Sequence, residues 1–200
     1  MELNSLQALY VDHLKDLYSA EKQILKALPK MIKAASHEEL AATFSEHLRV
    51  TERQVQRLDR IFADLEASPR GKKCIGMEGL IEEAQELLKE KPDPDVLDAG
   101  LIAKAQHVEH YEIAGYGTVR TYAEQLGLTR HAELLQQTLD EEGEADKRLS
   151  ALAEASINLE AEMGDGGDGA RSTSGGGGRS QGRASSGRGS RSRSSSRAGR

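Results

Sequence analysis

Apolar residues recur every three or four positions along most of the first 160 residues, which is the period of an amphipathic α-helix. This pattern predicts four long helices, at residues 4–35, 38–66, 95–126 and 129–157. A shorter amphipathic stretch at 77–90 predicts one more helix, in the connection between the second and third. No segment shows the alternation typical of a β-strand, so the predicted fold class is all-α.

The lengths of the breaks between these helices predict their directions. The first two helices, and the last two, are separated by only a few residues, which favours two antiparallel hairpins. The long connection between the hairpins allows the second and third helices to run parallel. We therefore expect a four-helix bundle with one long crossover that carries a short fifth helix. Pro29 predicts a bend or an early end in the first helix.

The composition changes abruptly at Gly164. Residues 164–200 contain no Leu, Ile, Val, Phe, Tyr or Trp and consist mainly of Gly, Ser and Arg. Such a segment buries too little apolar surface to offset the entropy of ordering the chain. We therefore expect one folded domain, residues 1–163, followed by a disordered tail. The tail carries a formal charge of +6 and the domain −12.

The basic tail has three interpretations. Alternating Arg and Ser at 188–200 favours weak, salt-sensitive contact with nucleic acid phosphates. The tail has no aromatic residue, so base stacking would not contribute. It is alternatively a flexible solubility extension, or a segment that folds back onto the acidic domain.

The remaining compositional signals predict a cytoplasmic protein. The single cysteine, Cys74, excludes an intramolecular disulfide and fits a reducing compartment. The first residues lack the basic and apolar regions of a signal peptide, and no segment approaches the length of a membrane span.

Acidic residues near the midpoints of the four long helices are the strongest functional signal. They are Glu21, Glu52, Glu109, Glu112 and Glu142. A carboxylate that faces a helical core is costly unless a charged group compensates it. Four helices that place carboxylates at one level of a bundle are typical of a two-metal centre. Under the alternative, these residues decorate solvated faces, as most acidic residues do.

The spacing within single helices strengthens the metal hypothesis. Glu109 and Glu112, at i and i+3, share one helix face, and Glu142 and Asp146 repeat the arrangement at i and i+4. Asp146 is therefore the sixth candidate ligand. His110, adjacent to Glu109, is expected to form hydrogen bonds beside the site. The other histidines are expected at the surface or at helix ends: His13, His37, His47, His107 and His131.

The site is unusually poor in nitrogen ligands. Two-metal carboxylate bundles commonly carry a histidine three residues after a glutamate on two helices. Val55 and Ala145 occupy those positions after Glu52 and Glu142. An oxygen-rich ligand set favours hard ions. Iron or manganese, as two ions, is therefore the predicted cofactor.

Three separated strings of residues resemble the YciF/YciE-type family of bacterial ferritin-like proteins. They are YSAEKQILKALPKM, KCIGMEGLIEEA and VEHYEIAGYGTVRTYAEQLG, within a similarity that spans roughly residues 4–158. The resemblance implies a ferritin-like four-helix bundle that forms a homodimer, a link to stress responses and a relation to rubrerythrin-type di-iron proteins. It places the same five glutamates as ligands.

Two functions remain open on the sequence. In the first, a stress-associated protein holds a dinuclear iron or manganese centre and reduces oxygen or peroxide. In the second, the bundle is a structural or interaction protein with a degenerate metal site. The missing histidines favour the second function, and the retained carboxylates favour the first.

Overall fold

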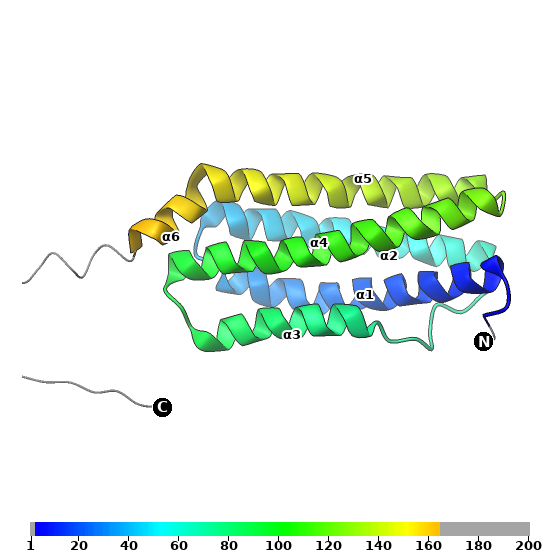
Figure 1. The fold of residues 1–200 in the computed structure, drawn as a ribbon, viewed down its shortest axis with the longest axis horizontal. Coiled ribbons are helices and arrows are strands. Elements are labelled where there is room, and N and C mark those ends of the chain that lie inside the picture. Colours follow the sequence, from blue (N-terminus) through cyan, green and yellow to red (C-terminus); the bar gives the residue numbers. More distant parts are fainter. Residues whose placement is uncertain (1–2, 165–200) are drawn as a thin grey trace, which may run out of the picture. The chain divides into compact units, whose positions relative to one another are not determined.

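The structure is a computed structural model that describes residues 3–164 as a bundle of helices (Figure 1). Its elements are α1 (Leu6–Ala34), α2 (Glu38–Asp64), α3 (Ile75–Glu90), α4 (Pro94–Gln125), α5 (Thr129–Leu152), a π-helical turn (Ala153–Ile157) and α6 (Asn158–Gly164). The predicted all-α fold is confirmed, and each predicted helix lies within a few residues of its expected range.

The four long helices form two antiparallel hairpins, α1–α2 and α4–α5, which pack side by side (Figure 1). The crossover that contains α3 brings the chain back, so α2 and α4 run parallel as the loop lengths predicted. α3 packs along α1 and α4, and α6 packs on α4. This is the ferritin-like four-helix bundle with a fifth helix in its crossover.

The turns between the hairpin helices are fixed by specific hydrogen bonds. The buried Asp98 carboxylate of α4 accepts hydrogen bonds from Ser36 N (3.0 Å), Ser36 Oγ (2.6 Å) and His37 N (2.8 Å), which satisfies backbone donors at the start of α2. Gly127, with φ of +73°, ends the α4 turn, and Leu128 N donates to Ala123 O at 2.8 Å. α1 continues through Pro29 to Ala34, so an early end at Pro29 is wrong.

The apolar core consists of two clusters separated along the bundle. One contains Ile24, Leu28, Phe44, Leu101 and Leu149, and the other contains Tyr10, Leu14, Leu58, Tyr116 and Leu135. Buried polar residues lie between them, contributed by all four long helices. These polar residues form the candidate site described below.

None of the helices within residues 3–164 combines the length and the apolar character needed to cross a lipid bilayer. The predicted disordered tail begins at Gly164, and all but that first residue lies outside the described residues.

Candidate metal centre

Five ionisable side chains from the four long helices form a buried polar layer. α1 supplies Glu21, α2 supplies His47, α4 supplies Glu109 and Glu112, and α5 supplies Glu142. Their exposed fractions are 0, 8, 2, 1 and 0% in that order. Burial this complete is unusual for glutamate, since carboxylates are almost never fully buried without a partner. The layer therefore requires a specific explanation.

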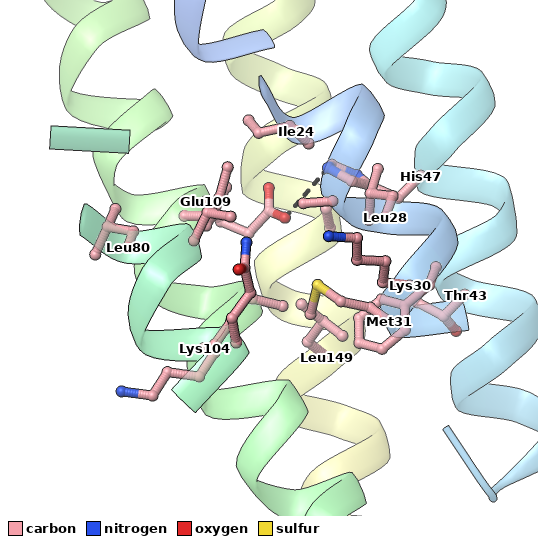
Figure 2. A pocket seen from close by; sticks show the side chains of 18 of the residues that line it. Ile24, Leu28, Lys30, Met31, Thr43, His47, Leu80, Lys104, Glu109 and Leu149 are labelled. Carbon is pink, nitrogen blue, oxygen red and sulfur yellow. Dashed lines mark ion pairs between the residues drawn. The ribbon is translucent and has the colours of Figure 1, made fainter. Parts of the chain in front are cut away.

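Four of these side chains converge on one point. His47, Glu109, Glu112 and Glu142 each offer one ligand atom, and these atoms all lie within 4.8 Å of one another. Ligand atoms on a common ion at roughly 2.1 Å are separated by up to about 4.2 Å, so a small closing movement would bring all four onto one cation. His47 Nε2 and Glu109 Oε1 are 3.3 Å apart, as the dashed line in Figure 2 marks.

Neutral donors orient two of the carboxylates. The buried Tyr116 hydroxyl donates to Glu21 Oε1, and the buried Gln54 amide donates to Glu142 Oε1. Each of these bonds leaves the second carboxylate oxygen without a partner. Donors that fix one oxygen and leave the other free are the arrangement that positions metal-binding carboxylates.

Arg57, a basic side chain whose charge acts on the layer, forms its ion pair with a residue outside the layer. Arg57 forms a bidentate ion pair with Glu141, with both N–O distances 2.6 Å, and also donates to Thr138 Oγ1 at 3.1 Å. Among residues 3–164, no lysine or arginine pairs with Glu21, Glu109, Glu112 or Glu142. The protein itself therefore leaves the negative charge of the layer largely uncompensated.

The electrostatics reflect this deficit. Burial raises the pKa of Glu21, Glu109 and Glu112 well above the ordinary value, and repulsion from Glu142 raises it further in each case. Burial also lowers the pKa of His47, so its imidazole is neutral near pH 7. Neutral imidazole is the form that binds metals. A divalent cation would relieve the repulsion among the carboxylates and use the free nitrogen of His47.

The unpaired atoms test whether a metal fits this chain. Six buried polar atoms of the layer lack a hydrogen-bond partner: Glu21 Oε2, His47 Nε2, Gln54 Oε1, Glu109 Oε2, Glu112 Oε1 and Glu142 Oε2. Buried polar atoms nearly always have a hydrogen-bond partner, and a group of exceptions in one place indicates that an ion or water binds there. Five of the six belong to metal-ligating residue types. The residues present therefore fit a bound cation.

The prediction that Glu52 belongs to this layer is wrong. Glu52 is exposed, whereas its neighbour Thr51 and Gln54 are buried. One residue along an α-helix rotates the side chain by about 100°, which turns Glu52 toward solvent. Its level along the bundle suggested a ligand, but its position around the helix axis excludes it.

Asp146 lies beside the layer and does not join the four converging residues. Its Oδ1 accepts a hydrogen bond from Gln106 Nε2 at 2.9 Å and lies 3.3 Å from His110 Nε2. The side chain of His110 is 68% exposed, as expected for a hydrogen-bonding group outside the site. Asp146 still acts on the layer, since its charge contributes to the raised pKa of Glu109.

Sequence reasoning missed His47, which the structure places at the centre of the site. The prediction that it is a surface or helix-end residue is wrong. Its spacing, three positions after the buried Phe44 and four before the buried Thr51, permits a place on the apolar stripe of α2, but Leu48 fits that spacing equally. Gln54 was missed for the same reason, three positions beyond Thr51. His131 lies in the first turn of α5, so it is at a helix end, one of its two predicted locations, and it is buried against Tyr10.

Comparison with known proteins identifies the family. Residues 5–162 match the domain of unknown function DUF892. The chain belongs to this family. It is 44% identical to Protein YciF of Escherichia coli strain K12 over 163 residues, which cover 81% of this chain and 98% of that protein.

Solved structures agree with this assignment. The crystal structure of YciF, described as an E. coli stress protein, matches with a TM-score of 0.75 and 44% identity over 78% of this chain and 99% of that chain. YcfI of Rhodopseudomonas palustris, assigned a structural role provisionally, matches with a TM-score of 0.73 and 43% identity over 74% of this chain and 95% of that chain. A Xanthomonas campestris protein, 21% identical over 80% of this chain and 98% of its own, shares the fold with a TM-score of 0.64.

Proposed function

We propose that this protein binds two metal ions, iron or manganese, in the polar layer of its bundle and serves in a stress response by reducing oxygen or peroxide. The observation that carries the proposal is the group of six unpaired polar atoms in a layer whose carboxylates form no ion pair with a lysine or arginine among residues 3–164. The description of YciF as a stress protein supports the physiological part of the proposal.

The residues divide between the two ions according to their neighbours. His47 and Glu109, which are 3.3 Å apart, would hold one ion. Glu21, whose strongest carboxylate neighbour is Glu142, would hold the other. Glu112 and Glu142, whose charges repel neighbouring carboxylates, would complete the ligand set of the two ions. When bound, such ions supply electrons at a water-poor position within the bundle.

The remaining residues of the layer orient these ligands. Gln54 fixes the Glu142 carboxylate, and Tyr116 fixes that of Glu21. The apolar clusters above and below exclude water, which strengthens electrostatic interactions within the layer. One imidazole and four carboxylates form an oxygen-rich set, which favours iron(II) or manganese(II) over softer ions.

A structural protein with a degenerate site is the second candidate. Val55 and Ala145 replace the histidines of the two-metal pattern, and the provisional structural role of YcfI points in the same direction. Elemental analysis of the protein purified without chelator separates the two. We expect close to two metal ions per chain. A metal-free protein that also fails to take up added iron(II) or manganese(II) supports the structural role.

A further inference from the structure

A mainly apolar cavity lies among the helices and is lined in part by two of the metal-binding residues, His47 and Glu109. Its volume is about 50 Å³, and its walls include Leu28 of α1, Phe44 of α2, Ala84 of α3 and Leu149 of α5. Figure 2 shows His47 and Glu109 lining the same cavity. The cavity is separate from the ligands Glu21, Glu112 and Glu142, which do not line it. It therefore reaches the layer from one side.

The cavity has space beside His47 and Glu109 because α5 carries Ala145 where the two-metal pattern carries a histidine. Ala145 stands three positions after Glu142, where the two-metal pattern carries a histidine. Ala145 also lines the cavity, together with His47 and Glu109. An imidazole at position 145 would occupy volume beside the other two side chains. Alanine in place of histidine at position 145 thus removes a nitrogen ligand and leaves space next to the ligands His47 and Glu109.

Size and polarity restrict what the cavity accepts. A volume of 50 Å³ holds about four groups of the size of water, which is too little for a long aliphatic chain. Apart from His47 and Glu109, the polar and charged residues of its wall are Lys30, Thr43, Gln85 and Lys104, and Lys104 is held by Glu83 at 2.7 Å. The other wall residues, Ile24, Leu28 and Phe44 among them, are apolar. Cavities of this kind stay dry and take up small apolar molecules such as xenon.

We infer that this cavity binds dioxygen and conducts it to the His47–Glu109 side of the metal centre. Dioxygen is small, uncharged and apolar, and loses no hydrogen bonds on entering. Hydrogen peroxide would give up hydrogen bonds to water along the apolar part of these walls, where Ile24, Leu28 and Phe44 replace none of them. The inference rests on the proposed function only for the reaction that follows. Bound iron(II) would supply the two electrons for that reaction, which with two protons from water would reduce dioxygen to hydrogen peroxide.

Xenon tests the binding step without any metal. Crystals of the metal-free protein under xenon pressure are expected to show a xenon atom among Leu28, Phe44, Ala84 and Leu149. Two variants fill the cavity from two neighbouring helices, Ala27→Phe from α1 and Ala84→Leu from α3, and both are expected to lose xenon. Ala103→Phe is the matched control, because Ala103 is exposed on α4 and does not line the cavity.

Oxidation of iron(II) tests the route itself. Stopped-flow rates with dioxygen are expected to fall several-fold in Ala27→Phe and Ala84→Leu, and to stay unchanged in Ala103→Phe. Rates with hydrogen peroxide are expected to stay unchanged in all three variants. An absence of xenon in the native protein overturns the inference, as does equal slowing with both oxidants. Xenon in a protein that binds no metal overturns the proposed function and leaves the apolar site established.

Discussion

His47 Nε2 lies 3.3 Å from Glu109 Oε1, and both side chains are nearly closed to solvent. The pair joins α2 to α4 across the bundle, in the polar layer between the two apolar clusters. Because burial holds His47 neutral, the pair is a poor ion pair and a suitable half of a metal site. Removal of His47 is therefore the most direct test of the centre.

We expect His47→Ala to lower the metal content per chain and to abolish most of the stabilisation by metal. A ligand at a hundredfold excess over its dissociation constant raises the free energy of unfolding by about 2.7 kcal/mol. Thermal unfolding with manganese(II) or chelator, together with elemental analysis, measures both effects. His110→Ala, which changes an exposed histidine on α4, serves as the control and should behave like the native protein. Equal loss in both variants would contradict the role of His47.

Glu112→Gln should stabilise the metal-free protein near pH 8 while reducing metal uptake. The substitution removes a buried charge that repels Glu21, Glu142 and Glu109. Replacing an uncompensated buried charge with a neutral isostere raises the free energy of unfolding by about 1–3 kcal/mol. Urea unfolding in chelator provides the measurement. Glu90→Gln, at the exposed end of α3, should change neither quantity. A destabilised metal-free Glu112→Gln protein would show that the carboxylate has a structural partner.

The metal-free protein should become less stable as the pH rises. The pKa values of Glu21, Glu109 and Glu112 are raised in the folded state, mainly by burial. Their unfolded pKa is about 4.3, so above that value the unfolded chain binds fewer protons than the folded one. The free energy of unfolding then falls until the pH passes the folded pKa values. Urea titrations in chelator from pH 5 upward measure this slope, and saturating manganese(II) should remove most of it.

Two glycines of α3 should respond in opposite directions to alanine. A Cβ on Gly76 would lie 2.7 Å from Tyr111 Cε2, and the Tyr111 hydroxyl is held by Asp16 at 2.8 Å and Cys74 Sγ at 2.9 Å. Gly76→Ala should therefore lower the thermal midpoint. A Cβ on Gly79 meets nothing within 4 Å, so Gly79→Ala should gain about 0.5–1 kcal/mol from reduced backbone entropy. A neutral Gly76→Ala would mean that Tyr111 moves freely.

If the basic segment 164–200 contacts nucleic acid, as one of its three interpretations has it, the DNA binding should be weak and salt should remove it. Eight arginines can displace counterions from several phosphates, so affinity should fall steeply as salt rises. Mobility shifts compare the full chain with a chain that ends at Met163, at low and physiological salt. Binding that survives removal of the tail, or that is absent even at low salt, contradicts this prediction.

The homodimer also stays a prediction, and sedimentation of the full chain tests it.

The sequence determined the helices and their order, because each long helix buries one stripe whose period of three to four residues is readable locally. It also determined that α1, α4 and α5 carry buried carboxylates. Glu21, Glu109, Glu112 and Glu142 lie on those stripes, and the structure places each of them inside. The energetic cost of burying them indicated a cation before any fold was known.

Only the tertiary structure decided which side chain of α2 completes the site. Glu52 and His47 are both near the middle of that helix, and their chemistry alone favours the carboxylate. The rotation of α2 about its axis is set by the packing of Phe44, Val55 and Leu58 in the core, and this rotation turns His47 inward and Glu52 outward. The cavity beside His47 was equally hidden, because its walls come from five helices that meet only in the folded chain.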